Sequence, residues 1–240
     1  MPLPDTTEPP AQAPGPAASV PVTHPDPGPA GPVALQHTSL TDYITRLASR
    51  APAPGGGAAA AVHAAQGAAL LAMVARYSTG AKYAEHSGPI ARVTGEADEL
   101  AARALRLADA DAAAFTAVTD AYRLPRATPQ EKAARSAAIA DALTGAAGPP
   151  AEVIAVAARA LDLADELLPV GNRNVLTDVA AAAEAARAAA TTARINVEIN
   201  LGGVRDSAER ARLSTAIAQV DALTARADRV TAAVRQEITQ

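Results

Sequence analysis

One carboxylate lies where an apolar residue is expected. Apolar residues recur every three or four positions from Leu100 to Tyr122, which predicts a long helix with one apolar face, and Asp111 lies on this face between Leu107 and Phe115. A carboxylate there is either paired with a cation or has a raised pKa, and a raised pKa suits acid–base catalysis near neutral pH. A structural ion pair with an arginine of another helix is the alternative, and the residues alone leave both open.

Two further charged residues bear on this chemistry. Asp109, about 200° around the helix from Asp111, is expected to face solvent near Arg106. Lys82 is one of only two lysines among 21 basic residues, the other being Lys132. A lysine in a chain that otherwise uses arginine suggests a need for a compact ammonium, although a cation at a helix C-terminus explains it equally well.

Glycines precede one predicted helix. The run Pro52–Gly57 ends in Gly55, Gly56 and Gly57, and glycines before a helix let backbone N–H groups approach an anion. No Gly-Lys-Ser/Thr follows and no strand precedes the run, so it is neither a P-loop nor a dinucleotide fingerprint. A tight turn between two closely packed helices is the simpler interpretation.

Two polar segments complete the candidates. Residues 171–178 include Asn172 and Asp178, and capping of the next helix would explain them as well as ligand binding would. Asn196 and Asn200 lie four residues apart in an otherwise apolar segment. Because buried amides must find hydrogen-bond partners, these two either tie helices together or present their amides to a polar ligand.

Composition excludes several classes of protein. The chain has no Cys, which rules out disulfide scaffolds and cysteine-ligated metal centres. The four His show no ligand spacing, so we expect no metal site. A net charge of −4 and 2% aromatic residues argue against nucleic acid as a partner.

The predicted fold is all-α, an up-and-down bundle of long, Ala-rich helices. Ala accounts for 67 of the 240 residues and has the highest helix propensity, and no segment alternates with period two. Residues 1–37 hold 11 prolines and are expected to be a disordered Pro-rich tail, with one helical domain at 38–240. We expect helices at about 39–49, 58–77, 89–122, 128–148, 151–168, 176–201 and 206–236.

Packing and location can also be predicted. An Ala methyl buries little area, so stability needs close helix contacts or a core shared between subunits, and we expect a homodimer or a larger homo-oligomer. Residues 51–75 carry no charge, but two Pro, four Gly and many Ala favour a buried core helix over a membrane span. We expect no membrane partner and a cytoplasmic location.

Taken in order, these segments resemble the cyclodeaminase/cyclohydrolase family of folate enzymes, from about residue 39 to 206. Each motif is weak alone, and their order and spacing carry the resemblance. The motifs are 47–49 with 52–57, Met73-Val74, Thr79–Tyr83, Asp109–Phe115, Leu124–Lys132 with Arg135, Gly171-Asn172, Thr177-Asp178 and Asn196–Leu201 with Asp206. Two departures are Thr177 in place of the usual Ser and a single lysine in the 80–82 run.

The resemblance implies an all-helical oligomer that acts on one-carbon tetrahydrofolates without a metal or a bound cofactor. It implies a catalytic carboxylate in the Asp109–Asp111 motif, which the helical face assigns to Asp111, and a supporting role for Lys82. The substrate-binding residues that it implies are Ser49, Gly55, Gly56, Gly57, Tyr83, Asn172, Asp178, Asn196 and Asn200.

The expected reaction is reversible hydrolysis of 5,10-methenyltetrahydrofolate to 10-formyltetrahydrofolate. Cyclodeamination of formimidoyltetrahydrofolate with release of ammonia is the alternative, and it ranks second because the chain shows no formimidoyltransferase segment. Two further hypotheses are the same fold acting on another amidine or imine, and a non-catalytic helical interaction module with the Pro-rich tail as its docking element.

Overall fold

The computed structural model describes residues 34–239, and every regular element in this range is helical. The long helices are α2 (Gly56–Arg76), α3 (Ser87–Arg123), α4 (Pro129–Leu167) and α5 (Leu176–Leu201). The shorter helices are α1 (Leu40–Ala48), α6 (Ser207–Ala218) and α7 (Val220–Ile238), with 3-10 turns η1 (Leu35–His37), η2 (Ala81–His86) and η3 (Arg173–Val175). The all-α prediction is confirmed.

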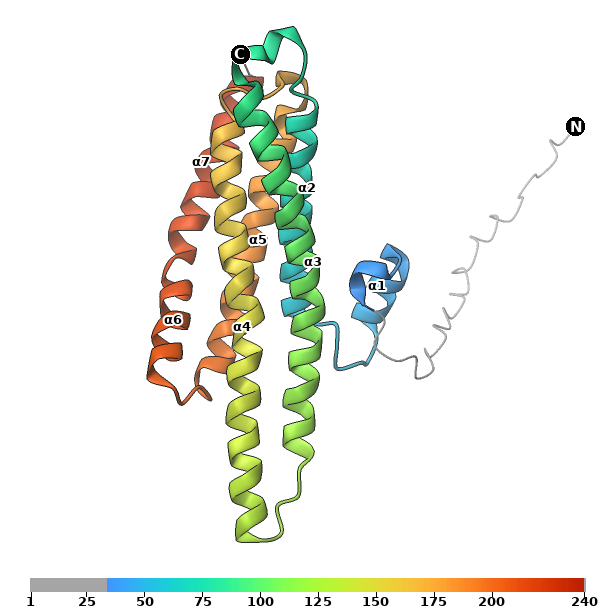
Figure 1. The fold of residues 1–240 in the computed structure, drawn as a ribbon, viewed down its shortest axis with the longest axis vertical. Helices are drawn as coiled ribbons and strands as arrows, with labels where there is room; N and C mark the ends of the chain where they lie inside the picture. The colour runs from blue at the N-terminus through green and yellow to red at the C-terminus, as the bar shows by residue number, and fades with distance from the viewer. Residues whose placement is uncertain (1–33, 240) are drawn as a thin grey trace, which may run out of the picture. The chain divides into compact units, whose positions relative to one another are not determined.

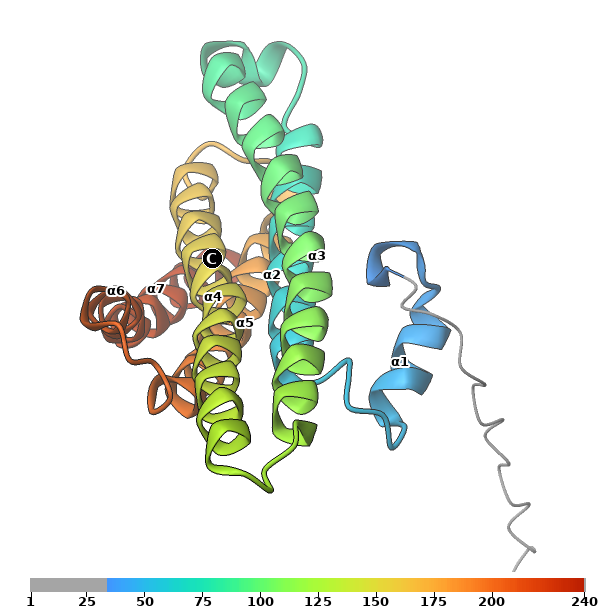
Figure 2. The same cartoon turned by 60° about the horizontal axis from the view of Figure 1, so that its bottom comes forward.

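The four long helices form an up-and-down bundle. Helix α2 packs against α3 and α5, and α4 packs against the same two, so the four close around one core. Helices α6 and α7 lie along the outside of α4 and α5 (Figure 1). The hairpin between α3 and α4 extends beyond the start of α2, as a second view shows (Figure 2). The outer halves of α3 and α4 are therefore little covered by other helices.

Helix α2 is the central helix, and small residues explain its position. Twelve of its residues are buried, and most are Ala or Gly. At Gly67 an added Cβ would lie 3.0 Å from the backbone oxygen of Ala182 in α5, so the two helices approach closely there. Length and composition would let α2 cross a bilayer, yet 61% of the relevant window is buried in the bundle. Its composition is thus explained by its place in the core.

Two helix boundaries differ from the sequence prediction. Helix α4 continues through Pro149 and Pro150, where we expected it to end. A proline inside a helix removes one backbone hydrogen bond, and burial of Pro150 and Ala151 in the core offsets that loss. The segment expected as one helix at 206–236 is divided at Gln219 into α6 and α7.

The 3-10 turn η1 lies within the segment that we expected to be a tail. Leu35 is buried in η1, and its backbone N–H donates to Asp109 of α3. Residues 34–37, which we expected in the tail, are therefore held on α3 by one apolar side chain and one partly buried carboxylate. The expected disorder of the remaining tail concerns residues 1–33, which lie outside the described residues.

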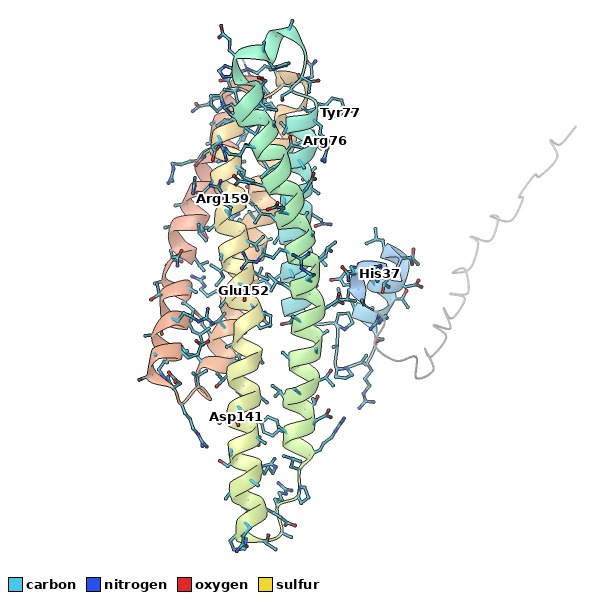
Figure 3. All side chains as sticks on the ribbon, viewed as in Figure 1. His37, Arg76, Tyr77, Asp141, Glu152 and Arg159 are labelled. Atoms are coloured by element: carbon cyan, nitrogen blue, oxygen red, sulfur yellow. The ribbon has the colours of Figure 1, made fainter. Side chains whose placement is uncertain are left out.

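Charged side chains lie on the outer faces of α3, α4 and α7. Arg159, labelled in Figure 3, pairs with Glu96 of α3 and with Asp162, and Arg226 of α7 also pairs with Asp162. Glu152, also labelled, pairs with Arg103 of α3 at 2.8 Å. These half-exposed pairs add little stability each, but they distinguish this surface from the uncharged face of α2 and α5.

Candidate active site

A cavity of about 440 Å³ lies where the start of α2 meets α3, α4 and the end of α5. It brings together six residues selected from the sequence for their chemistry. These are Gly55, Gly56, Gly57, Asp111, Asn196 and Asn200. The remaining lining is apolar or aromatic apart from the hydroxyl of Tyr122, and it consists of Pro52, Ala53, Phe115, Val118, Tyr122, Leu143, Ala146 and Ile199.

Asp111 provides the acidic group of this cavity. Its carboxylate accepts a hydrogen bond from the backbone N–H of Ala58, in the first turn of α2. Burial raises the pKa of Asp111 above its ordinary value, and the Ala58 hydrogen bond opposes part of that rise. Within residues 34–239 no cation contributes to this pKa, so the ion-pair interpretation of Asp111 is not supported.

Asp109 has a different environment. It lies against η1, where its carboxylate accepts a hydrogen bond from the Leu35 N–H, and its side chain is only partly exposed. The expectation that it faces solvent was wrong, because the chain before α1 folds back onto α3. Asp109 does not line the cavity, which leaves Asp111 as the carboxylate available to a ligand there.

The glycine run begins helix α2. Gly55 is the N-cap, and Gly56 and Gly57 form the first turn. The free N–H groups and the positive end of the helix dipole at this terminus favour a negative charge, and Asp111 itself occupies that position. The anionic group that lies against the glycines is therefore the Asp111 carboxylate of the same chain.

Asn196 and Asn200 line the opposite wall. The Asn196 amide donates to the Thr192 carbonyl at 2.8 Å, and the Asn200 amide donates to the Asn196 carbonyl at 2.8 Å. Asn200 also approaches the Ala146 carbonyl of α4 at 3.4 Å. That carbonyl lacks its usual helical donor because residue 150 is proline. Each amide nitrogen thus donates to backbone, and the side-chain oxygens remain as acceptors for a ligand.

The aromatic and aliphatic rim of the cavity was missed as a binding surface. Phe115 and Tyr122 lie on the same stripe as Asp111, which the helical period had shown, but they are 45% and 52% exposed instead of packed in the core. Arg135 of α4 lies over the Tyr122 ring at 5.5 Å and donates to the Tyr122 carbonyl. The periodicity identified the apolar face of α3. This face stays exposed to solvent near Phe115 and Tyr122 because the α3–α4 hairpin extends beyond the other helices.

Comparison with known proteins shows the family of this chain. Residues 39–219 match the model of the formiminotransferase-cyclodeaminase family. The chain belongs to this family. A methenyltetrahydrofolate cyclohydrolase from Methylorubrum extorquens is 38% identical over 171 residues, which are 71% of this chain and 82% of that protein.

Two further relatives support membership of the cyclodeaminase family. Mouse formimidoyltransferase-cyclodeaminase is 34% identical over 76% of this chain and 34% of its own length, so the chain spans about a third of that protein. A formiminotetrahydrofolate cyclodeaminase structure from Thermotoga maritima superposes with a TM-score of 0.74 at 27% identity, covering 85% of this chain and 98% of that one.

In this cyclodeaminase-family chain Lys82, Tyr83 and Asn172 lie at the far end of α2. Lys82 is exposed, with its ammonium 5.5 Å from the Tyr83 ring centre, and Tyr83 lines a separate cavity of about 430 Å³. Asn172 donates to the Tyr77 carbonyl at 2.8 Å, and Tyr77 is labelled with Arg76 in Figure 3. The 21 residues of α2 separate this end from Asp111 by about 30 Å.

The remaining two predicted residues also lie outside the Asp111 cavity. Asp178 is in the first turn of α5, on the same end of the bundle as Asn172. Ser49 donates its hydroxyl to the Arg46 carbonyl at 2.7 Å and ends helix α1. A single chain therefore does not bring Lys82, Tyr83, Asn172, Asp178 or Ser49 to the carboxylate, and their roles in binding stay predictions.

Proposed function

We propose that this protein hydrolyses 5,10-methenyltetrahydrofolate to 10-formyltetrahydrofolate reversibly, with Asp111 as the group that moves protons. Its family makes it a folate one-carbon enzyme of the cyclohydrolase/cyclodeaminase type. The observation that carries the assignment is a single, partly buried carboxylate, with a raised pKa and without a paired cation, in a cavity of about 440 Å³. That volume lies in the range of pockets that enclose a small molecule.

The chemistry requires one proton to be taken up and returned. Asp111 accepts a proton from water as the oxygen bonds to the carbon that bridges N5 and N10. The resulting tetrahedral carbon then loses its bond to N5, and Asp111 gives the proton to N5 as that bond breaks. The formyl group stays on N10, and the oxygen proton is released to solvent. Folate is the substrate, and the proposed mechanism uses no metal or cofactor.

The surroundings of Asp111 suit both halves of this cycle. A carboxyl with an ordinary pKa is a weak base at neutral pH and is rarely protonated there. Burial raises the pKa of Asp111, so both protonation states become accessible closer to neutrality. The Asn196 and Asn200 oxygens can accept hydrogen bonds from the N–H groups of a pterin, and the faces of Phe115 and Tyr122 can cover its rings.

Cyclodeamination is the second candidate, and two similarities favour it. The superposable Thermotoga protein is a formiminotetrahydrofolate cyclodeaminase, and the mouse relative carries the same activity in its name. In that reaction N10 attacks the formimino carbon, and Asp111 takes the N10 proton and gives it to the former formimino nitrogen. The bond between that nitrogen and the carbon then breaks, and ammonia leaves. We rank hydrolysis first because the relative at 38% identity, matched over 82% of its length, is a cyclohydrolase.

A spectrophotometric assay tests both reactions on the purified full chain. Methenyltetrahydrofolate absorbs in the near ultraviolet, so loss of this band above the spontaneous rate shows hydrolysis. Appearance of the band from formimino-tetrahydrofolate, together with free ammonia, shows cyclodeamination. If neither folate is converted faster than without protein, the proposed function is wrong.

Asp111→Asn tests the residue assignment. Asn keeps the size of the side chain and can still accept the Ala58 N–H, but it cannot transfer a proton. We expect kcat to fall by about 10²–10⁴-fold, the usual contribution of a general acid–base, while thermal unfolding stays cooperative. Asp109→Asn removes the neighbouring carboxylate outside the cavity and should stay within about tenfold of the wild type. Full activity of Asp111→Asn would exclude the assignment.

We also propose that two copies associate through the exposed faces of α2 and α5. This face carries no charged residue from Ala59 to Met73 on α2, and α5 adds Ala181, Ala185, Ala188, Thr192 and Ile195. A groove of about 560 Å³ runs along it between the helices. Two helices of this length present roughly 600 Å², close to the roughly 800 Å² per partner of a standard interface. A second copy of the same uncharged face is its most complementary partner.

A further inference from the structure

We propose that Gly57 is a positioning residue for Asp111: only a residue without a Cβ lets the carboxylate lie against the first turn of α2 and accept the Ala58 N–H. This proposal rests on the proposed function, in which Asp111 transfers the proton. It assigns to Gly57 a part in catalysis that is separate from contact with substrate.

The space at Gly57 is occupied by the carboxylate. A Cβ built on Gly57 would lie within 3.0 Å of both oxygens of Asp111, at 2.6 Å from Oδ2. Real Cβ atoms do not approach other heavy atoms this closely, so any larger residue must displace the carboxylate. The Asp111 side chain thus fills the position that a side chain of residue 57 would take.

The two preceding glycines do not share this constraint. A Cβ on Gly56 would lie 3.5 Å from the Asn196 amide nitrogen, an ordinary contact, and a Cβ on Gly55 would have nothing within 4 Å. Backbone conformation does not require glycine at 57 either, because Gly80 is the one glycine with positive φ in the described part of the chain. Space for the carboxylate is therefore the reason for glycine at 57.

The effect of replacing a glycine depends on which atoms the added Cβ would contact. At Gly67 and Gly171 an added Cβ would meet backbone oxygens, of Ala182 and Leu167, which cannot move without shifting a helix. At Gly57 it would meet the end of a short side chain that can rotate. Gly57→Ala should therefore keep the fold and turn the Asp111 carboxylate away from Ala58, into the cavity.

Steady-state kinetics with methenyltetrahydrofolate tests this on the full chain. We expect Gly57→Ala to lower kcat by about 100-fold, as a misplaced catalytic group does, and to leave KM within about threefold. Gly95→Ala, on an exposed face of α3 where an added Cβ has nothing within 4 Å, is the control and should stay within about twofold of the wild type. In the Asp111→Asn background, Gly57→Ala should cause no further loss, because Gly57 acts through the carboxylate.

A second measurement needs no substrate. Carboxyl ¹³C NMR follows the titration of Asp111, and the other ionisable residue lining the cavity is Tyr122, since α2, α4 and α5 contribute no ionisable group to it. Burial is the larger cause of the raised pKa of Asp111, so the pKa should move toward its ordinary value in Gly57→Ala and stay unchanged in Gly95→Ala. Should the wild type convert no folate, the proposed function fails and this titration still decides the positioning role.

Three results would overturn the proposal. One is an unchanged kcat and an unchanged Asp111 titration in Gly57→Ala. Another is an equal loss in Gly95→Ala, which would indicate a general effect of replacing a helical glycine. The third concerns folding: Asp111→Ala removes the obstructing carboxylate, so Asp111→Ala with Gly57→Ala should unfold at the same temperature as Asp111→Ala alone or at a higher one, because Ala has the higher helix propensity. A lower unfolding temperature of the double variant would mean that Gly57 serves the fold.

Discussion

At the scale of single residues, Asp111 combines two opposing influences. Desolvation in the cavity disfavours its charged form, and the Ala58 N–H at the start of α2 favours that form. Because burial is the larger influence, the folded protein binds the Asp111 proton more tightly than the unfolded chain does. Asp111 therefore contributes most to the free energy of unfolding at pH values below the pKa that it has in the unfolded chain. That contribution is lost as the pH rises through the pKa that it has in the folded protein.

This linkage predicts how Asp111→Asn changes stability with pH. Asn stays neutral, so the variant should be more stable than the wild type at pH 7 and should lose this advantage as pH falls below about 4, where Asp111 is protonated in both states. Urea unfolding at pH 7 and pH 3.5 measures the difference. Asp141→Asn, on the exposed outer part of α4, controls for the general loss of a carboxylate. A variant less stable than the wild type at pH 7 would contradict the prediction.

At the scale of helices, small residues determine which helices meet. The close approach of α2 to α5 at Gly67 sets the register that carries Asn196 to the start of α2, where it faces Gly56. The prolines of α4 act differently: Pro150 leaves the Ala146 carbonyl without a helical donor, and Asn200 of α5 approaches it. Both features place a wall of the cavity through contacts between helices far apart in sequence.

Gly67→Ala tests the contact between α2 and α5. The added methyl would lie 3.0 Å from the Ala182 carbonyl oxygen, so the helices must separate, and we expect a loss of about 1–3 kcal/mol in the free energy of unfolding. Gly95→Ala is the matched control on an exposed face of α3 with nothing within 4 Å, and it should gain about 0.5–1 kcal/mol from helix propensity. Equal effects in denaturant unfolding would show that the close approach does not limit packing.

At the scale of the whole molecule, the described chain has one charged side and one uncharged side. Ion pairs link α3, α4 and α7, whereas α2 and α5 expose Ala, Leu, Met and Ile. Ile195 and Ile199 are 62% and 78% exposed and continue this face to the rim of the Asp111 cavity. Association through it would bury these side chains and close one side of the cavity mouth.

Ala69→Glu tests that association. Ala69 lies in the groove between α2 and α5, and a carboxylate there would face its own copy in a symmetric dimer without a compensating cation. Light scattering should give the wild type twice the 24.1 kDa chain mass and the variant one chain mass at the same concentration. Ala133→Glu, exposed on the outer part of α4, is the matched control and should remain dimeric. A monomeric wild type would refute the proposed interface.

The sequence by itself determined the helical class, most helix positions and the face on which Asp111 lies. Ala content and a three-to-four residue period are local properties, and so is the capping box that Thr128 and Glu131 form at the start of α4. These local rules failed at Pro149 and Pro150, because burial of the helix outweighed the lost hydrogen bonds.

Only the tertiary structure decided which candidate residues meet. Asn196 lies 85 positions after Asp111 in the chain yet shares its cavity, whereas Lys82 is closer in sequence and lies at the opposite end of α2. A helix is a rod that rises about 1.5 Å per residue, so its period fixes a face but says nothing of its neighbours or their register. Contacts between distant segments, such as Gly67 with Ala182 and Gly57 with Asp111, supply that information.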